Sequence, residues 1–363
     1  MLKPREIIAG LNPYHSPIVS RAGLNLDLNE SMAGCSPRVL RRLHALTAED
    51  VSRYPQRETG EQLVANFLGI ASDQVLLTNG IDEALSLLFT SYLGAGDELL
   101  FADPTFVMYP MLGQALGGQM ARVQSGEDLT LPVAELLARI SPRTRVVAIA
   151  NPNNPTGLAA SRADLLRIAE AAPDAAVLID EAYFEFCDGA LAAGKAVLAK
   201  TMISEIENHP NLFVARTFSK AHGLAGLRLG VLAGAVEQID YLRRLSLPFN
   251  VNSVALTCLE EALADSSFVS EHVAEVKRGR DRLAQLFTEL GLRFWPSQTN
   301  FVLVRIGAQA RTFAELMQRR GVLVRDSSVN PGCEGCVRIT VGTPAQMDGV
   351  LQAIREAITE TRR

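Results

Sequence analysis

Short apolar runs alternate with amphipathic segments between positions 74 and 234. Uninterrupted apolar runs of this kind are typical of strands that are buried on both faces of a parallel sheet. The segments between them carry helix-start signals; Ser161 and Asp164, for example, begin a helical pattern in the manner of a capping box. This alternation predicts an α/β fold with a large, doubly wound, mostly parallel sheet. The predicted strands are at 75–78, 98–102, 145–150, 176–180, 212–218 and 229–232.

The pattern changes after residue 250 and predicts a second, smaller α+β unit. The first fifty residues contain a loose arm and a helix start at Ser36 and Pro37, too little to fold alone, so we expect them to pack on the second unit or on another subunit. We predict an N-terminal arm that forms part of the small domain (1–44), a large domain (45–250) and a small C-terminal domain (251–363). Within the small domain, the pattern predicts long helices over 251–291, two strand pieces, a helix at 311–321, strands near 322–325 and 336–341, and a closing helix.

The composition limits the kinds of molecule that the protein is expected to bind. The chain has 363 residues, of which 48% are hydrophobic and 21% charged, so it can bury a sizeable core. A net charge of −5 and a pI near 5.7 give no basic field, which argues against nucleic acid and anionic membranes as partners. The first ten residues resemble neither a signal peptide nor an anchor, and no run of eighteen apolar residues occurs. We expect a cytoplasmic protein with small-molecule partners.

The cysteines predict neither a disulfide framework nor a metal site. Their number, five, is odd, which favours a reducing compartment. Cys333 and Cys336 have the spacing of half a zinc knuckle, but the other cysteines supply no second pair and no histidine is near in sequence. A turn before a strand is the favoured interpretation of this segment.

The segment around Lys220 carries the strongest chemical signal. Lys220 follows an apolar, strand-like run and precedes a glycine-bearing turn, so we expect it at the edge of a cleft. A lysine in such a place can be desolvated and held as a Schiff base. Thr217, Ser219 and Arg228 supply the donors that a phosphate needs. This combination suggests pyridoxal phosphate, although a solvated surface lysine is the simpler interpretation of the Ser219-Lys220 pair alone.

Three further segments place polar groups at predicted strand ends. Gly80 follows a strand and opens a helix, whose first amides could bind an anion. Asn154 lies in a turn fixed by two Asn-Pro steps and could point into the cleft. Asp180 ends an apolar strand, and a carboxylate in such surroundings needs a cationic partner to stay charged. A protonated pyridine nitrogen would be one such partner.

Taken together, these segments resemble a fold type I pyridoxal-phosphate aminotransferase, and most closely the histidinol-phosphate aminotransferase family. The resemblance covers nearly the whole chain and depends on the order and spacing of many short motifs. It implies a homodimeric enzyme of histidine biosynthesis that uses pyridoxal 5'-phosphate and interconverts histidinol phosphate and imidazole acetol phosphate, with 2-oxoglutarate and glutamate as the other pair. The motifs are at 13–14, 28–30, 54–55, 78–83, 103–106, 154–157, 180–183, 217–228, 321–326 and 338–343.

The resemblance implies a cofactor role for individual residues. Lys220 is implied to bind the cofactor covalently and to move the proton at the substrate Cα. Asp180 is implied to pair with the pyridinium, which keeps the ring an electron sink. Asn154 and Tyr183 are implied to hydrogen-bond the ring oxygen, and Phe106 to lie against the ring face. The implied phosphate ligands are Gly80, Ile81, Asp82, Thr217, Ser219 and Arg228, together with Tyr54 of the partner subunit.

Substrate binding is implied to depend on two arginines. Arg338 matches the family arginine that grips a carboxylate with a bidentate fork, and Asn154 lies beside the substrate. Arg325, with Tyr14 and Arg338, is implied to receive a substrate phosphate. Two arginines in one pocket repel each other unless a strongly anionic ligand binds, so the pair suits glutamate and a phosphate monoester.

Some features depart from the family pattern and leave alternatives open. Phe106 stands where tyrosine is more usual, Ser31 and Met32 replace an Asn-Pro step, the segment 184–211 is long, and His222 takes a place that is often aromatic. The alternatives are an aromatic or broad-specificity aminotransferase and a decarboxylase of phosphothreonine. A transcription regulator that senses pyridoxal phosphate is disfavoured because the chain shows no basic winged segment.

Overall fold

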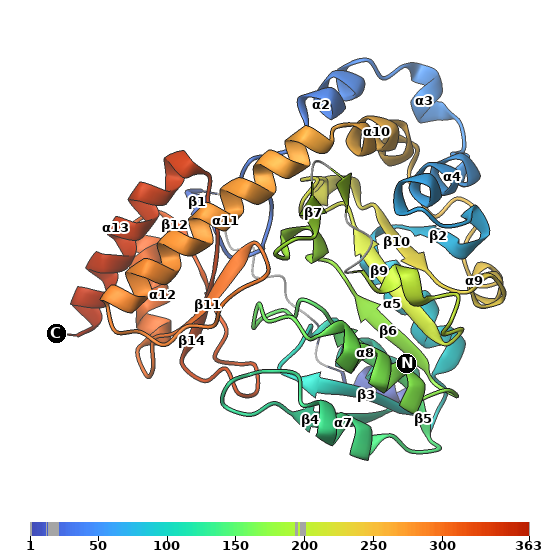
Figure 1. Cartoon of the computed structure of the whole chain (residues 1–363), viewed down its shortest axis with the longest axis horizontal. Coiled ribbons are helices and arrows are strands. Elements are labelled where there is room, and N and C mark those ends of the chain that lie inside the picture. Colours follow the sequence, from blue (N-terminus) through green and yellow to red (C-terminus); the bar gives the residue numbers. More distant parts are fainter. Residues whose placement is uncertain (1, 12, 14–21, 193–194, 197–200, 363) are drawn as a thin grey trace.

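A seven-stranded sheet forms the centre of the computed structural model, which describes residues 2–11, 13, 22–192, 195–196 and 201–362 (Figure 1). The strand order is β2-β10-β9-β6-β5-β3-β4. Neighbouring strands pair in parallel except that β10 runs antiparallel to β2 and β9. The strands are β2 (Val75–Thr78), β3 (Glu98–Asp103), β4 (Gln119–Gln124), β5 (Thr144–Ala150), β6 (Ala176–Asp180), β9 (Leu212–Thr217) and β10 (Gly230–Ala233).

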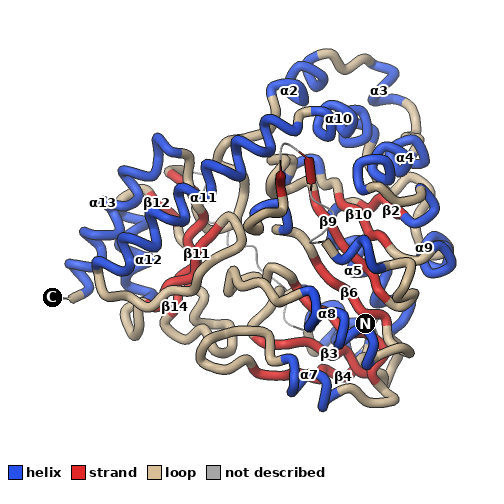
Figure 2. Tube along the Cα trace, in the orientation of Figure 1, coloured by secondary structure: helices blue, strands red, loops and turns tan. Residues whose placement is uncertain are grey.

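Helices cover both faces of this sheet (Figure 2). One face packs against α4, α7, α8 and α10, and the other packs against α5, α6 and α9. Strands covered on both sides bury every side chain, as β2, β3, β6, β9 and β10 do, which explains their uninterrupted apolar runs. The helices are α4 (Arg57–Leu68), α5 (Gly80–Tyr92), α6 (Met108–Leu116), α7 (Val133–Arg139), α8 (Arg162–Ala171), α9 (Val236–Arg243) and α10 (Ser253–Ala264).

A three-stranded sheet, β11-β14-β13, has a separate core against three helices. The long helix α11 runs from α10 to this small sheet (orange in Figure 1). Strand β1 pairs in parallel with β12, which attaches the segment near residue 24 to the same unit. The elements are β1 (Leu24–Asn25), α11 (Ser266–Glu289), β11 (Phe301–Arg305), α12 (Ala310–Arg319), β12 (Val322–Leu323), β13 (Arg325–Asp326), β14 (Cys336–Thr340) and α13 (Pro344–Thr361).

The remaining elements are short. Helix α2 packs on α10 and α1 contacts α6. Strands β7 and β8 pair in antiparallel fashion within the long segment after β6. No helix in the described ranges is both long and apolar enough to cross a membrane. The bounds are α1 (Glu6–Ala9), α2 (Pro37–His44), α3 (Ala48–Ser52), β7 (Leu191–Ala192) and β8 (Lys195–Ala196), with 3-10 turns at Ser72–Gln74, Phe184–Phe186, Met202–Glu205 and Ala225–Leu227.

Most predicted elements are confirmed. All six strands of the first part are present, the Ser161 side chain caps α8 through the Asp164 amide, and Ser36 caps α2. The helical stretch after residue 250 is two helices, because a new helix begins after its N-cap Asp265. Strand β4 was not predicted; it lies at the sheet edge and alternates exposed with buried residues. The domain boundaries 1–44, 45–250 and 251–363 stay a prediction.

Candidate active site

A cavity of about 690 Å³ lies between the carboxyl ends of β5, β6 and β9 and the strands β13 and β14. The crevice beyond the carboxyl ends of parallel strands is where ligands bind in open α/β sheets. The structure brings most of the predicted site residues together here, on elements far apart in the sequence. Those that line the cavity are Ile81, Asp82, Phe106, Asn154, Asp180, Tyr183, Thr217, Ser219, Lys220, Arg228, Arg325 and Arg338.

Lys220 follows β9 and its side chain reaches into the cavity. Its Nζ donates to the carbonyl oxygen of Leu28 at 3.4 Å and lies 5.8 Å from the centroid of the Tyr183 ring. Burial lowers the pKa of Lys220 to about 8, and the positive charges of Arg338 and Arg228 also lower it. A useful fraction of this amine is therefore neutral, and hence nucleophilic, near neutral pH.

Asp180 ends β6 and is only 3% exposed. The Tyr109 hydroxyl donates to its Oδ2 at 2.9 Å, and the Ala182 amide donates to its Oδ1 at 3.0 Å. Burial nevertheless outweighs these hydrogen bonds and raises the pKa of Asp180 to about 6. A cation placed against this carboxylate would restore its charge, and the ring nitrogen of a protonated pyridine is such a cation.

A cluster of donors lies where α5 begins directly after β2. Arg228 donates from Nη2 to Asp82 Oδ2 at 3.2 Å, and the Ser219 amide donates to Thr217 Oγ1 at 3.1 Å. Gly80 has a φ of +76°, and a Cβ built there would lie 2.6 Å from Arg228 Nη2. The missing side chain of Gly80 therefore gives the guanidinium its place at the helix N-terminus, where an anionic phosphate is stabilised.

Tyr183 and Asn154 are each hydrogen-bonded to another residue that lines the cavity. Asn29 donates from Nδ2 to the Tyr183 hydroxyl at 2.9 Å. Arg338 donates from Nη1 to Asn154 Oδ1 at 2.6 Å, and its guanidinium lies 5.2 Å from the centroid of the Phe301 ring. Burial raises the pKa of Tyr183, so its hydroxyl is protonated at neutral pH and can donate a hydrogen bond.

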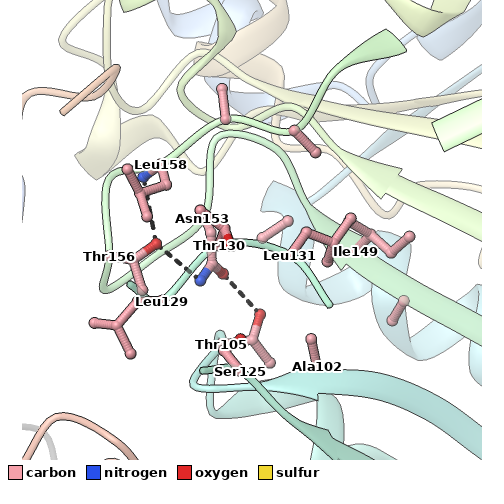
Figure 3. A pocket seen from close by; sticks show the side chains of 14 residues that line it. Ala102, Thr105, Ser125, Leu129, Thr130, Leu131, Ile149, Asn153, Thr156 and Leu158 are labelled. Atoms are coloured by element: carbon pink, nitrogen blue, oxygen red, sulfur yellow. Dashed lines mark hydrogen bonds between the residues drawn. The ribbon is translucent and has the colours of Figure 1, made fainter. Parts of the chain in front are cut away.

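Asn153 is the centre of a hydrogen-bonded network that includes Thr105 and Thr156 (Figure 3). Asn153 donates from Nδ2 to the Pro104 carbonyl at 2.8 Å and to Thr156 Oγ1 at 3.1 Å, and its Oδ1 accepts from Thr105 Oγ1 at 3.0 Å. This network borders a smaller pocket of about 70 Å³. It links the turn after β3, which carries Phe106, to the turn after β5, which carries Asn154, and so fixes the two turns relative to each other.

Arg325 and Arg338 face each other as a registered pair on the antiparallel strands β13 and β14. Their side chains both line the cavity. Gly80 and Tyr54 are predicted site residues that are not among those lining the cavity; Gly80 lies beside the Arg228 guanidinium. Tyr54 is 77% exposed and stacks on Phe249, with ring centroids 4.3 Å apart, and its contact with the phosphate of a partner subunit stays a prediction. Tyr14 lies outside the described residues, and its role stays a prediction.

Some residues of the site were not singled out from the sequence. Tyr109 holds Asp180, Asn29 holds Tyr183, and Asp27 lines the cavity beside the two arginines. Asn29 belongs to a motif that carried the family resemblance, which is a usable signal. Tyr109 and Asp27 stand in segments that gave no chemical signal, because their partners are distant in the sequence.

The side chains of the cavity fit pyridoxal phosphate at each of its polar groups. A lysine with a lowered pKa suits the aldehyde, a buried aspartate suits the ring nitrogen, and Ser219 and Arg228 suit the phosphate. Asn154 and Tyr183 line the same cavity as Asp180 and suit the ring hydroxyl.

Comparison with known proteins agrees with this chemistry. A family model described as "Aminotransferase class I and II" matches residues 21–354. Histidinol-phosphate aminotransferase 2 of Pseudomonas fluorescens is 37% identical over 92% of this chain and 89% of its own length. Histidinol-phosphate aminotransferase of Dehalococcoides mccartyi is 31% identical over 97% of this chain and 96% of its own length.

Solved structures give the same result for the fold. Histidinol-phosphate aminotransferase from Sinorhizobium meliloti, solved in complex with pyridoxal-5'-phosphate, superposes with a TM-score of 0.89 at 26% identity over 99% of both chains. L-threonine-O-3-phosphate decarboxylase from Porphyromonas gingivalis shares the fold, with a TM-score of 0.78 at 23% identity over 94% of this chain and all of that one. The predicted fold, enzyme class and cofactor are confirmed, and the chain belongs to the class I and II aminotransferase family.

Proposed function

We propose that this chain is a pyridoxal-phosphate-dependent histidinol-phosphate aminotransferase. It exchanges an amino group between histidinol phosphate and 2-oxoglutarate, which gives imidazole acetol phosphate and glutamate. The observation that carries the proposal is the placement of Lys220 opposite the paired guanidinium groups of Arg325 and Arg338 in one cavity. The names of the curated relatives support the choice of substrate.

In this proposal the residues of the large sheet hold the cofactor. Lys220 binds it covalently, Asp180 pairs with its ring nitrogen, and Asn154 and Tyr183 hydrogen-bond the ring oxygen. Phe106 lies against the ring face. The phosphate is held by the α5 N-terminus at Gly80, Ile81 and Asp82, and by Thr217, Ser219 and Arg228. When bound, pyridoxal phosphate supplies an aldehyde for the amino group and an electron sink for the substrate carbanion.

The protein side chains position the substrate and move its proton. Lys220 takes the proton from the substrate Cα and returns it, which an amine with a pKa of about 8 can do near neutral pH. The Tyr109 hydroxyl keeps Asp180 oriented. Arg338 and Arg325 bind the anionic end of each substrate, so that both half-reactions use one cavity.

We also propose that the active protein is a cytoplasmic homodimer with shared active sites. Exposed apolar side chains around Tyr54 support an interface there: Tyr54 is 77%, Leu247 70% and Phe249 52% exposed. Tyr54 of the partner subunit then reaches the cofactor phosphate. The five free cysteines are consistent with a reducing compartment.

Single-turnover spectroscopy tests the substrate. The cofactor-loaded protein is mixed with histidinol phosphate, histidinol, L-phenylalanine or L-threonine O-phosphate, and the absorbance of the cofactor is followed. Histidinol phosphate should react fastest and at the lowest concentration, because it alone combines the imidazole with a phosphate for the two arginines. Equal reaction of histidinol and its phosphate would refute the substrate. Release of CO2 from L-threonine O-phosphate would identify a decarboxylase instead.

A further inference from the structure

Asp27 places a carboxyl group in the part of the cavity where the arginines lie. Its segment is held between two strands of the small unit: the Leu26 amide donates to the Leu323 carbonyl at 2.8 Å, and the Thr340 amide donates to the Leu26 carbonyl at 2.9 Å. Arg338 donates from Nη2 to the backbone oxygen of Asp27 at 2.6 Å. Asp27 is one of the residues that line the cavity, and it is only 6% exposed. Backbone pairing on both sides leaves this carboxyl group little freedom to move away.

The charges around Asp27 come from three segments. Arg325 projects from β13, Arg338 from β14 and Glu30 from the segment of Asp27 itself. Burial is the largest influence on the pKa of Asp27 and raises it; the backbone hydrogen bond, Arg325 and Arg338 lower it, Glu30 raises it, and the net pKa is above the ordinary value. The Oδ1 atom has no hydrogen-bond partner among the described residues. This carboxyl group is therefore able to change its protonation state, and its Oδ1 is a buried acceptor that no described protein group satisfies.

We propose that Asp27 determines which anions the site accepts, because it is ionised opposite a singly charged carboxylate and protonated opposite a phosphate. When ionised, it balances one of the two guanidinium charges and leaves room for one negative charge. When a phosphate binds, Asp27 takes up one proton from solvent and donates a hydrogen bond from its carboxyl group to a phosphate oxygen; the proton returns to solvent when the phosphate leaves. This rests on the proposed function, in which the amine substrate carries a phosphate.

The electrostatics require such a change. An ionised Asp27 and a phosphate dianion would repel each other in a site shielded from water, where charge interactions are several times stronger than in bulk water. Protonation removes the repulsion and converts an acceptor into a donor. A bound dianion raises the pKa of Asp27 above its value in the free protein. Phosphate binding is then strongest below the free pKa, and weakens as the pH rises toward the pKa of the complex.

Asp27→Asn tests this, because asparagine has the same shape, always offers a donor and never ionises. Michaelis constants for histidinol phosphate are measured with the cofactor-loaded wild type and variant at about pH 6 and about pH 8.5. The ratio of the wild-type constant to the variant constant at one pH cancels the effect of ionisation of the substrate phosphate itself. At the higher pH the variant should have an about tenfold lower Michaelis constant than the wild type, and this difference should become smaller at the lower pH.

Two controls separate this role from others. Asp326→Asn removes a carboxylate one residue from Arg325 that does not line the cavity, and it should leave the ratio near one at both pH values. With glutamate as the amino donor, Asp27→Asn should change the Michaelis constant less than it does with the phosphate ester. A larger Michaelis constant for Asp27→Asn with both donors, equal at both pH values, would overturn the proposal and make Asp27 a residue that only positions the arginines.

Inorganic phosphate separates this inference from the proposed substrate. Its inhibition constant against the glutamate half-reaction reports anion binding without histidinol phosphate. Inhibition of Asp27→Asn about tenfold tighter than that of wild type at about pH 8.5 supports the role of Asp27, even if histidinol phosphate fails as a substrate. An inhibition constant unchanged by the substitution would refute that role, even if histidinol phosphate is the substrate.

Discussion

A lysine can serve this cavity only if it loses its proton near neutral pH. The protein achieves this mainly by burying Lys220, and secondly by placing Arg338 and Arg228 within reach of its charge. The same arginines have other proposed tasks, on the substrate and on the phosphate. Each therefore acts at two points of the reaction, and a substitution at either should change the titration of Lys220 as well as ligand binding.

The first prediction concerns the recombination of cofactor-free protein with pyridoxal phosphate. Only the neutral amine attacks the aldehyde. The rate should therefore rise with pH and reach half of its maximum near pH 8, the pKa of Lys220. Arg338→Met should move this midpoint upward, because it removes a positive charge that favours the neutral amine. Stopped-flow absorbance measures the rate. Arg355→Met, on the exposed face of α13, is the control; a midpoint shared by all three proteins would contradict the role given to Arg338.

The second prediction concerns Asp180 in cofactor-free protein. Its pKa is raised to about 6 in the fold, so its contribution to stability is fully present below the pKa of the unfolded chain and is lost as the pH rises through about 6. Asp180→Asn removes this dependence. From about pH 5 to pH 7 the stability of the variant relative to wild type should increase by about 1–2 kcal/mol. Urea unfolding at both pH values measures the difference, and a constant difference would contradict the raised pKa.

A residue of the site could be predicted from the sequence when the residues next to it in the chain indicated its position in the fold. Lys220 and Asp180 could be found because each polar group ends an apolar strand, and such ends meet at one edge of a parallel sheet. Tyr109, Asn29 and Asp27 could not be found in this way. Their functions arise from contacts with Asp180, Tyr183 and Arg338, which are brought close only by the fold.

At the scale of elements, the turn between β2 and α5 packs closely against the start of β10. Gly230 of β10 shows how close it is, because a Cβ there would lie 2.6 Å from the backbone carbon of Gly80. A side chain at Gly230 would therefore meet the N-terminus of α5, and one at Gly80 would meet Arg228. The sequence predicted the strand and the helix, but the antiparallel direction of β10, which creates this contact, has no local signal.

The third prediction compares two glycines with positive φ. Gly80→Ala and Gly96→Ala should each lose about 1 kcal/mol of stability, since alanine is strained at φ values of +76° and +90°. Only the Gly80 variant meets Arg228, because nothing lies within 4 Å of a Cβ at Gly96. Gly80→Ala should bind pyridoxal phosphate about tenfold more weakly through the displaced guanidinium. Equilibrium titration with the cofactor measures this, and equal affinity of the two variants would remove Gly80 and Arg228 from the phosphate site.

A buried ion-pair network joins β9 to the segment after β6. Arg216 donates to Glu181 at 2.9 Å and to Glu185 at 2.7 Å, and all three residues are almost fully buried. The network fixes the segment that carries Tyr183, between the two glutamates, relative to the strand that leads to Lys220. The sequence did not predict this pairing, because Arg216 and its two glutamate partners are far apart along the chain.

The fourth prediction is that Arg216→Met lowers the free energy of unfolding by about 3–5 kcal/mol, because it leaves two buried carboxylates without their cation. Arg244→Met, which breaks the exposed pair with Asp240, should change it by less than about 1 kcal/mol. Chemical unfolding measures both. Similar losses for the two variants would mean that the buried network is not what stabilises this part of the protein.

At the scale of the whole molecule, the cavity is a boundary between two sheets. Asp180 ends a strand of the large sheet and Lys220 follows another, whereas Arg325 and Arg338 belong to the small sheet, and α11 connects the two parts (Figure 1). Hydrophobic patterns predicted both units, but their relative placement depends on packing between side chains that no local pattern records. If Tyr54 completes the site from another chain, as proposed, a third part of the site lies outside the chain altogether.

The fifth prediction tests that sharing with two defective variants. Lys220→Ala lacks the reactive amine, and Tyr54→Ala should bind the cofactor weakly, so each alone should have little activity at a cofactor concentration that just saturates wild type. In a mixed dimer, one site combines Lys220 of the Tyr54→Ala chain with Tyr54 of the Lys220→Ala chain and is therefore intact. Unfolding and refolding equal amounts together should restore about a quarter of the wild-type sites. If Tyr54 instead serves its own chain, no intact site can form and the mixture should stay as inactive as its components.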